Sequence, residues 1–152
     1  MRSVLGELLD EGDSGADVIV DMEAGLEHLS RGTTRHVDTL LAVAEPYYRS
    51  LETARRVSEL GRELGIARVH LLANKVASSD DATALRDFAT RHGLTLAAEL
   101  PYADAAAQAE RQRAALVDTI DARAPLLRAL DDLADQLLHG FTSPSSAFGS
   151  DS

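Results

Sequence analysis

The sequence contains no cysteine and no tryptophan. Without a thiol, this chain alone forms no disulfide, no zinc–thiolate site and no iron–sulfur ligation. No apolar run approaches the ~20 residues of a membrane-spanning helix, and the acidic residues that begin at Glu7 come too early for a signal peptide. We therefore expect a cytoplasmic protein that does not bind a membrane.

Lysine is almost as scarce, because Lys75 is the only one among 15 basic residues. A P-loop needs Gly-x-x-x-x-Gly-Lys-Ser/Thr, in which backbone N–H groups and the lysine hold phosphates. Lys75 lies within Ala-Asn-Lys-Val, so the sequence contains no P-loop. The net charge of −10 disfavours a nucleic-acid surface, which needs a basic patch. It is compatible with a ligand that is bridged by Mg²⁺.

The apolar pattern alternates between strand and helix periods. Strands are predicted at residues 18–21, 39–45, 68–74 and 94–100, and helices at 4–11, 50–64, 80–92, 104–116 and from Pro125. Ser50, and Asp80 or Asp81, are the candidate N-caps. We expect an α/β fold with a parallel sheet of about four strands and helices on both faces. Residues 1–138 would form one domain, and residues 139–152 a disordered tail rich in Ser, Gly and Pro.

Asp21 is the sharpest candidate site residue. Residues 17–25 read Asp-Val-Ile-Val-Asp-Met-Glu-Ala-Gly, which predicts a buried strand that delivers Asp21 to its carboxyl end. Open α/β sheets bind ligands at that edge. An acid there holds Mg²⁺ through water or accepts a phosphoryl group; the alternative is a capping acid at a strand–loop junction. Gly25 lets the backbone approach a phosphate, or simply forms a turn.

Asn74 and Lys75 end the third predicted strand. An Asn side chain pairs with both the donor and the acceptor edge of a purine. GTPases that use Asn-Lys carry an Asp two residues after the lysine, and Ala77 stands there, so guanine selectivity is not supported. The pair equally fits an ordinary, solvated strand end.

Residues 17–38 resemble the second nucleotide-binding segment of the MinD/ParA group of P-loop ATPases. Within that group they are most similar to the CooC-type accessory ATPases, which serve nickel insertion into carbon monoxide dehydrogenase. This branch typically reads Asp-Met-Glu-Ala-Gly-(Ile/Leu)-Glu-His-Leu and then Arg-Gly-Thr, as the chain does from Asp21. Glu45-Pro46, Asn74-Lys75-Val76 and Leu100-Pro101-Tyr102 follow in the order of the family. The resemblance covers about Val4 to Leu138.

The resemblance implies an ATP and Mg²⁺ site. Asp21 would be the catalytic acid that holds the water shell of Mg²⁺. The nucleotide-binding residues would be Ala24 and Gly25, which sense the γ-phosphate, Asn74 and Lys75 at the adenine, and Pro101 and Tyr102 near the base. Residues 27–35 would form a moving switch that signals to a partner. The implied partners are a second copy, a full-length ATPase of the family, or a metalloenzyme client.

The resemblance also implies what is missing. In P-loop folds, the P-loop strand normally lies between the strand that carries this acid and the strand that follows it. The chain would correspond to the C-terminal portion of such an ATPase, with little or no ATPase activity alone. Residues 18–21 and 39–45 would then pair with each other or leave apolar edges. We expect marginal stability or a tendency to associate.

Two other interpretations stay open. The first is a phospho-receiver domain with Asp21 as the acceptor and Lys75 ending a later strand. However, twenty residues before Asp21 leave little room for a receiver's first acidic pair, and Val76 replaces the usual proline. The second is a non-enzymatic interaction module that pairs with a full-length ATPase through its helices and residues 27–35.

Overall fold

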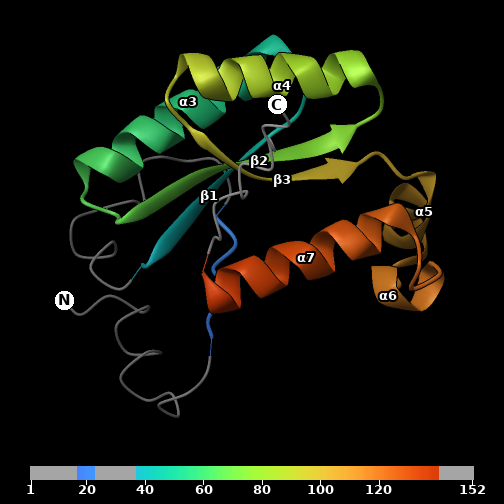
Figure 1. Cartoon of the computed structure of the whole chain (residues 1–152). Helices are drawn as coiled ribbons and strands as arrows, with labels where there is room; N and C mark the ends of the chain where they lie inside the picture. Colours follow the sequence, from blue (N-terminus) through green and yellow to red (C-terminus); the bar gives the residue numbers. More distant parts are fainter. Residues whose placement is uncertain (1–16, 23–36, 141–152) are drawn as a thin grey trace, which may run out of the picture.

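The computed structural model describes residues 17–22 and 37–140. Strands and helices alternate from β1 to α5, and two further helices follow (Figure 1). Their order is β1 (Thr39–Ala44), α3 (Tyr48–Glu63), β2 (Arg68–Val76), α4 (Ser79–Arg91), β3 (Thr95–Pro101), α5 (Asp104–Gln112), α6 (Leu116–Thr119) and α7 (Pro125–His139). None of the described helices is long and apolar enough to cross a membrane.

The described strands form one parallel sheet in the order β1-β2-β3. Ala44 of β1 is in register with Ala73 of β2, and Val76 of β2 with Pro101 of β3. The β2–β3 register shifts between Leu71 and Leu72 and again between Ala73 and Val76. All three strands therefore deliver their carboxyl ends to the same edge of the sheet.

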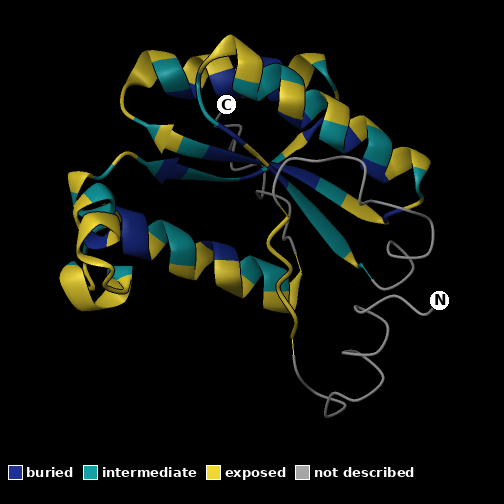
Figure 2. Cartoon of the chain, turned by 180° about the vertical axis from the view of Figure 1, so that it is seen from behind, coloured by how far each residue is buried: buried dark blue, intermediate teal, exposed yellow. Residues whose placement is uncertain are grey.

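Helices cover both faces of the sheet, as the sequence predicts (Figure 1). On one face, α3 and α4 pack over Ala42, Leu71 and Ala73. On the other, Leu126 and Leu133 of α7 pack over a second apolar cluster that contains Leu72, Ala97 and Leu100. Figure 2 shows the buried residues on the strands and on the sides of the helices that face them. Strands that are apolar on both faces are typical of parallel sheets between helices.

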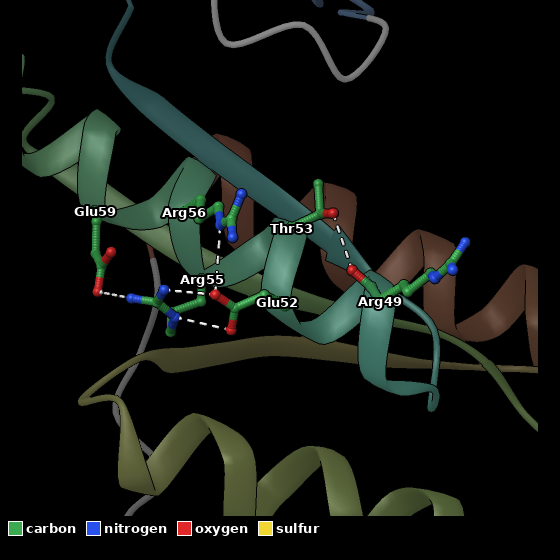
Figure 3. Close-up of polar contacts among 6 residues, drawn as sticks. All are labelled: Arg49, Glu52, Thr53, Arg55, Arg56 and Glu59. Atoms are coloured by element: carbon green, nitrogen blue, oxygen red, sulfur yellow. Dashed lines mark hydrogen bonds and ion pairs between the residues drawn. The ribbon is translucent and has the colours of Figure 1, made fainter.

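Helix α3 combines a close inner contact with a charged outer surface. A Cβ atom on Gly61 would lie 2.5 Å from Leu40 Cδ2, so the missing side chain lets the helix approach the sheet. On the outer surface, Arg55 donates hydrogen bonds to Glu52 and Glu59 (Figure 3). The hydrogen bonds from Arg55 lower the pKa of Glu52 to about 2. These pairs, three and four residues apart, stabilise the helix and form a solvated charged surface.

The predicted strand at residues 18–21 is wrong. Residues 17–22 belong to no strand, and all of them are exposed (Figure 2). Within the described residues the sheet has three strands rather than about four, because β1 pairs with β2 alone. An apolar run becomes a strand only when a neighbouring strand satisfies its backbone groups, and no described strand does this for Val18–Val20.

The predicted caps also differ from the structure. Tyr47, not Ser50, precedes α3 as its N-cap, and Ser50 Oγ instead accepts a hydrogen bond of 2.9 Å from the Glu45 N–H. Ser78 caps α4, in a capping box with Asp81 at the third helical position. Asp80 and Asp81 therefore lie in the first turn of α4, where the positive end of the helix dipole stabilises negative charges.

The carboxyl-terminal region follows the prediction in outline. The predicted helix 104–116 is broken, because Arg113 adopts a left-handed backbone with φ 53° and separates α5 from α6. Pro125 stands in the first turn of α7, where its missing N–H costs nothing. The predicted helix at residues 4–11, the predicted switch at residues 27–35 and most of the predicted tail lie outside the described residues.

Candidate functional site

The carboxyl edge, which comprises the ends of β1, β2 and β3 and the residues directly after them, gathers four of the predicted site residues. Asn74 and Lys75 lie at the end of β2. Pro101 ends β3 and Tyr102 follows it. The Tyr102 N–H donates a hydrogen bond of 2.9 Å to the Val76 carbonyl, which ties these two strand ends together. Because β2 and β3 are parallel neighbours, their carboxyl ends meet although Asn74 and Pro101 are 27 positions apart in the sequence.

Asn74 supports an unusual backbone conformation at Lys75. Lys75 has φ 56°, in the left-handed region that residues other than glycine rarely adopt. The Lys75 N–H donates a hydrogen bond of 3.0 Å to Asn74 Oδ1, which helps to hold this turn. The amide oxygen retains a second lone pair, and the amide nitrogen retains two N–H donors. Half-buried Asn74 thus has both a structural contact and free hydrogen-bonding capacity.

Lys75 is anchored across the sheet by Glu45, the residue after β1. Lys75 Nζ donates a hydrogen bond of 2.8 Å to Glu45 Oε1. This hydrogen bond and the charge of Glu45 raise the pKa of Lys75, while partial desolvation opposes them. The Glu45 N–H is itself held by Ser50. The ammonium group is therefore directed to the β1 side of the edge.

All three tyrosines of the chain lie at or beside this edge. Tyr47 precedes α3, Tyr48 is the first residue of α3, and Tyr102 follows β3. Their exposed fractions are 53%, 79% and 51%. The Tyr102 hydroxyl donates a hydrogen bond of 3.1 Å to Asp104 Oδ1. Exposed phenol rings beside a half-buried amide can stack on a planar heterocycle while the amide reads its edge.

Of the predicted Mg²⁺ and phosphate residues, Asp21 alone lies among the described residues. Asp21 is exposed, lies in no strand, and makes no hydrogen bond or ion pair with another described residue. Ala24 and Gly25 lie outside the described residues. Within 17–22 and 37–140, no three His, Asp or Glu side chains come together as a metal site. Among these residues there is therefore no ready-made cluster of metal ligands, and the role of Asp21 in holding Mg²⁺ through water stays a prediction.

Sequence reasoning did not select Glu45 or Tyr47 as site residues. The signal for Glu45 was available, since it ends an apolar run just as Asn74 does, and parallel strands end at the same edge. Its pairing with Lys75 depends on the left-handed turn at Lys75, which no residue pattern announces. Tyr47 stands three residues after the end of β1 and belongs to no motif.

Comparisons with curated proteins identify relatives that match part of the chain. The carbon monoxide dehydrogenase accessory protein CooC of Rhodospirillum rubrum is 44% identical over 95 residues, which cover 62% of this chain and 35% of that protein. Two uncharacterized ATP-binding proteins of Methanocaldococcus jannaschii are each 39% identical to this chain. The first matches over 87 residues, which cover 56% of this chain and 34% of that protein. The second matches over 103 residues, which cover 67% of this chain and 39% of that protein. No protein-family model matches the chain.

Solved structures of MinD and ParA ATPases share the fold. The MinD cell division protein of Aquifex aeolicus has a TM-score of 0.58 at 17% identity, covering 70% of this chain and 46% of that chain. A ParA family ATPase of Chlorobium tepidum has a TM-score of 0.56 at 20% identity, covering 74% and 45%. At these identities the likeness concerns the fold alone.

The expected resemblance is thus confirmed over part of the chain. The chain is partially homologous to CooC and to ATP-binding proteins, and it shares the parallel sheet and flanking helices of MinD and ParA ATPases. It spans about a third of the length of the curated relatives named above.

Proposed function

We propose that the carboxyl edge is the adenine-binding side of a nucleotide site, in a protein related to the CooC-type accessory ATPases. One observation carries the proposal: β2 and β3 bring Asn74 together with Pro101 and Tyr102, tied by the hydrogen bond between Tyr102 and Val76. The homology to CooC and to ATP-binding proteins supports an adenine nucleotide as the ligand.

Each part of this edge has a definite task in base recognition. The free N–H donors and the remaining lone pair of Asn74 match the acceptor and donor edge of adenine. The Tyr102 ring supplies a stacking face. Glu45 holds the Lys75 ammonium toward β1. The absence of an acid at Ala77 removes the group with which GTPases select guanine.

The chain supplies little for the phosphates. It has no P-loop, and Lys75, its single lysine, pairs with Glu45. Phosphoryl transfer depends on a backbone and lysine cradle with Mg²⁺ between the phosphates. We therefore propose that this chain alone binds the base weakly and does not hydrolyse ATP. Use of ATP and Mg²⁺ would require residues beyond those that the structure describes.

A titration that compares adenosine with ATP tests this proposal directly. If the base supplies the contacts, adenosine and ATP should bind with affinities within about threefold of each other, and Mg²⁺ should change neither affinity. A phosphate contact that contributed roughly 1.4 kcal/mol would instead make ATP bind tenfold more tightly than adenosine. Amide chemical shifts of the chain report the binding, and Asn74 contributes the only asparagine side-chain amide signal. ATP binding a hundredfold tighter than adenosine would contradict the proposal.

Substitutions at Asn74 separate its two tasks. Asn74→Asp keeps an oxygen that accepts from the Lys75 N–H but removes both amide donors, so the fold should persist while adenosine binding falls about tenfold. Gln136→Ala is the matched control, because it deletes an amide from the carboxyl-terminal part of α7, which points away from the carboxyl edge (Figure 1). If both variants bind adenosine equally well, Asn74 does not contribute to the binding site.

The identity with CooC also supports a role in metalloenzyme maturation. We propose that the chain acts there with a second polypeptide that provides the phosphate cradle. ATPase activity that appears only when such a P-loop protein is added would support this role, and activity of the chain alone would refute it. The phospho-receiver alternative gains no support, because Asp21 lies at no strand end.

A further inference from the structure

The end of β2 contains one residue more than the stretch of β3 beside it. Ala73 is in register with Glu99, and Val76 with Pro101. Three steps along β2 therefore match two steps along β3, which makes a β-bulge in β2. Bulges often change the direction of a side chain next to a binding site. This bulge contains the two residues between Ala73 and Val76, so it sets the direction of the Asn74 amide.

The bulge depends on a left-handed residue that is not glycine. Lys75 has φ 56°, and its Cβ atom disfavours this conformation. Two contacts hold the residue there. The first lies within the bulge, where the Lys75 N–H donates a hydrogen bond of 3.0 Å to Asn74 Oδ1. The second comes from outside β2, because Lys75 Nζ donates a hydrogen bond of 2.8 Å to Glu45 Oε1.

Glu45 is itself held in place after the end of β1. Its N–H donates a hydrogen bond of 2.9 Å to Ser50 Oγ of α3. Its side chain is 29% exposed, against 54% for the side chain of Lys75. A left-handed residue breaks the alternation of side chains along a strand, so the backbone of Lys75 and the direction of its side chain change together. By holding the ammonium group, Glu45 therefore favours the bulged form of β2.

We infer that Glu45 is a positioning residue for the base site, because its ion pair with Lys75 holds the bulge that directs the Asn74 amide to the base. The inference rests on the proposed function above. Glu45 acts through Lys75, whose N–H fixes the amide oxygen and leaves the amide nitrogen to the ligand. The bulge also places Val76, whose carbonyl accepts the hydrogen bond from Tyr102.

The first test is adenosine binding by Glu45→Gln, a variant that removes the charge and keeps the size of the side chain. Adenosine is uncharged at neutral pH, so the loss of an acid does not change the attraction of the site for the ligand. An ion pair exposed to this degree contributes little, and we expect adenosine binding to weaken by about two- to fivefold. Titration followed by amide chemical shifts measures the change.

Glu110→Gln is the matched control for this variant. Glu110 lies on α5 and is exposed, and its charge raises the pKa of Lys75 without a hydrogen bond between the two side chains. The control should leave adenosine binding unchanged. Equal losses in both variants would overturn the inference, because negative charge near Lys75, and not the contact with Glu45, would then support binding.

The second test asks whether Glu45 acts through the turn at Lys75. Glycine adopts the left-handed conformation without an anchor, so a Lys75→Gly chain should still bind adenosine. In that chain, Glu45→Gln should cause no further loss of affinity. A second full loss would overturn the inference. So would a Lys75→Gly chain that binds no adenosine, since the ammonium group would then be a direct contact of the base.

The conformation of the bulge can also be measured without a ligand. Lys75 is the only lysine of the chain, so labelling lysine with ¹³C and ¹⁵N gives one backbone signal, whose Cα and Cβ chemical shifts report the backbone conformation. Glu45→Gln should move these shifts toward extended values, while Glu110→Gln should not. Unfolding would change every amide signal of the chain and is thereby recognised. Unchanged Lys75 shifts in Glu45→Gln would overturn the inference.

The results distinguish the inference from the proposed function on which it rests. An unsubstituted chain that binds no adenosine would refute the proposed function, whatever the Lys75 signal shows. If the unsubstituted chain binds adenosine and Glu45→Gln binds it equally well, the proposed function stands and Glu45 is not a positioning residue.

Discussion

At the scale of single residues, His70 contributes to the dependence of stability on pH in mild acid. It lies in the central strand β2 and is only 8% exposed. Its register partner is Leu41, so it shares the face that α7 covers. Burial lowers the pKa of His70 below the ordinary value of 6.5, and the nearby positive charge of Arg68 lowers it further. Protonation of His70 is therefore harder in the folded chain than in the unfolded chain.

This difference predicts a loss of stability in mild acid. As the pH falls through 6.5, the unfolded chain takes up a proton that the folded chain does not, so the free energy of unfolding decreases. Replacing His70 with Gln should flatten this dependence between about pH 7 and pH 5. Urea titrations across that range measure it, and His139→Gln, at an exposed histidine, should keep the slope of the unsubstituted chain. A slope unchanged by His70→Gln would contradict the prediction.

At the scale of elements, the start of α4 shows what residue patterns can specify. The helix was predicted from its apolar spacing, but the cap was assigned to Asp80 or Asp81. The structure places Ser78 at the N-cap, where its Oγ accepts a hydrogen bond of 3.1 Å from the Asp81 N–H, and Asp81 Oδ2 accepts from the Ser78 N–H at 3.1 Å. Several adjacent Ser and Asp residues can each cap a helix, so the residue pattern alone does not fix which of them precedes the first turn.

The capping box at Ser78 can be tested by one pair of alanine substitutions. Ser78→Ala removes the side-chain acceptor for the Asp81 N–H and should lower the free energy of unfolding by about 1 kcal/mol. Ser79→Ala, one residue further in the first turn, removes a hydroxyl that makes no cap and should change it by less than about 0.5 kcal/mol. Urea unfolding midpoints give both values. Equal losses would show that the cap is not specific to Ser78.

At the scale of the whole molecule, the sheet order explains which predictions succeeded. β2 and β3 are neighbours that connect through α4, so the apolar patterns that predict both strands also predict that their ends meet. That Asn74 and Pro101 share a base site is what the family resemblance implies. Residues 18–21 have the same apolar character, yet they needed a strand that the described residues do not provide. A sequence pattern indicates that a segment is suited to a strand. Whether the segment forms one depends on a neighbouring strand that can satisfy its backbone hydrogen bonds. The Lys75–Glu45 contact escaped prediction for a related reason, since it needs both the sheet order and a left-handed turn.

On one face of the sheet, α7 alone among the described helices supplies fully buried side chains to the apolar cluster, and this locates a weak point of the fold. α3 and α4 share one face, while Leu126 and Leu133 of α7 carry the packing on the other. Leu133→Ala should therefore lower the free energy of unfolding by about 2–5 kcal/mol, through lost burial and the cavity left behind. A domain of this size has about 5–15 kcal/mol in total, so the variant should melt far below the unsubstituted chain.

Leu138→Ala is the matched control for α7, because it shortens a leucine of the same helix that is 58% exposed. It should change the free energy of unfolding by less than about 0.5 kcal/mol. Far-UV circular dichroism during thermal unfolding separates two outcomes. If α7 is essential to the fold, strands and helices lose their signal together in Leu133→Ala. If α7 alone detaches while α3 and α4 stay helical, the sheet and its other two helices form an independent unit, and the single-domain prediction for residues 1–138 is contradicted.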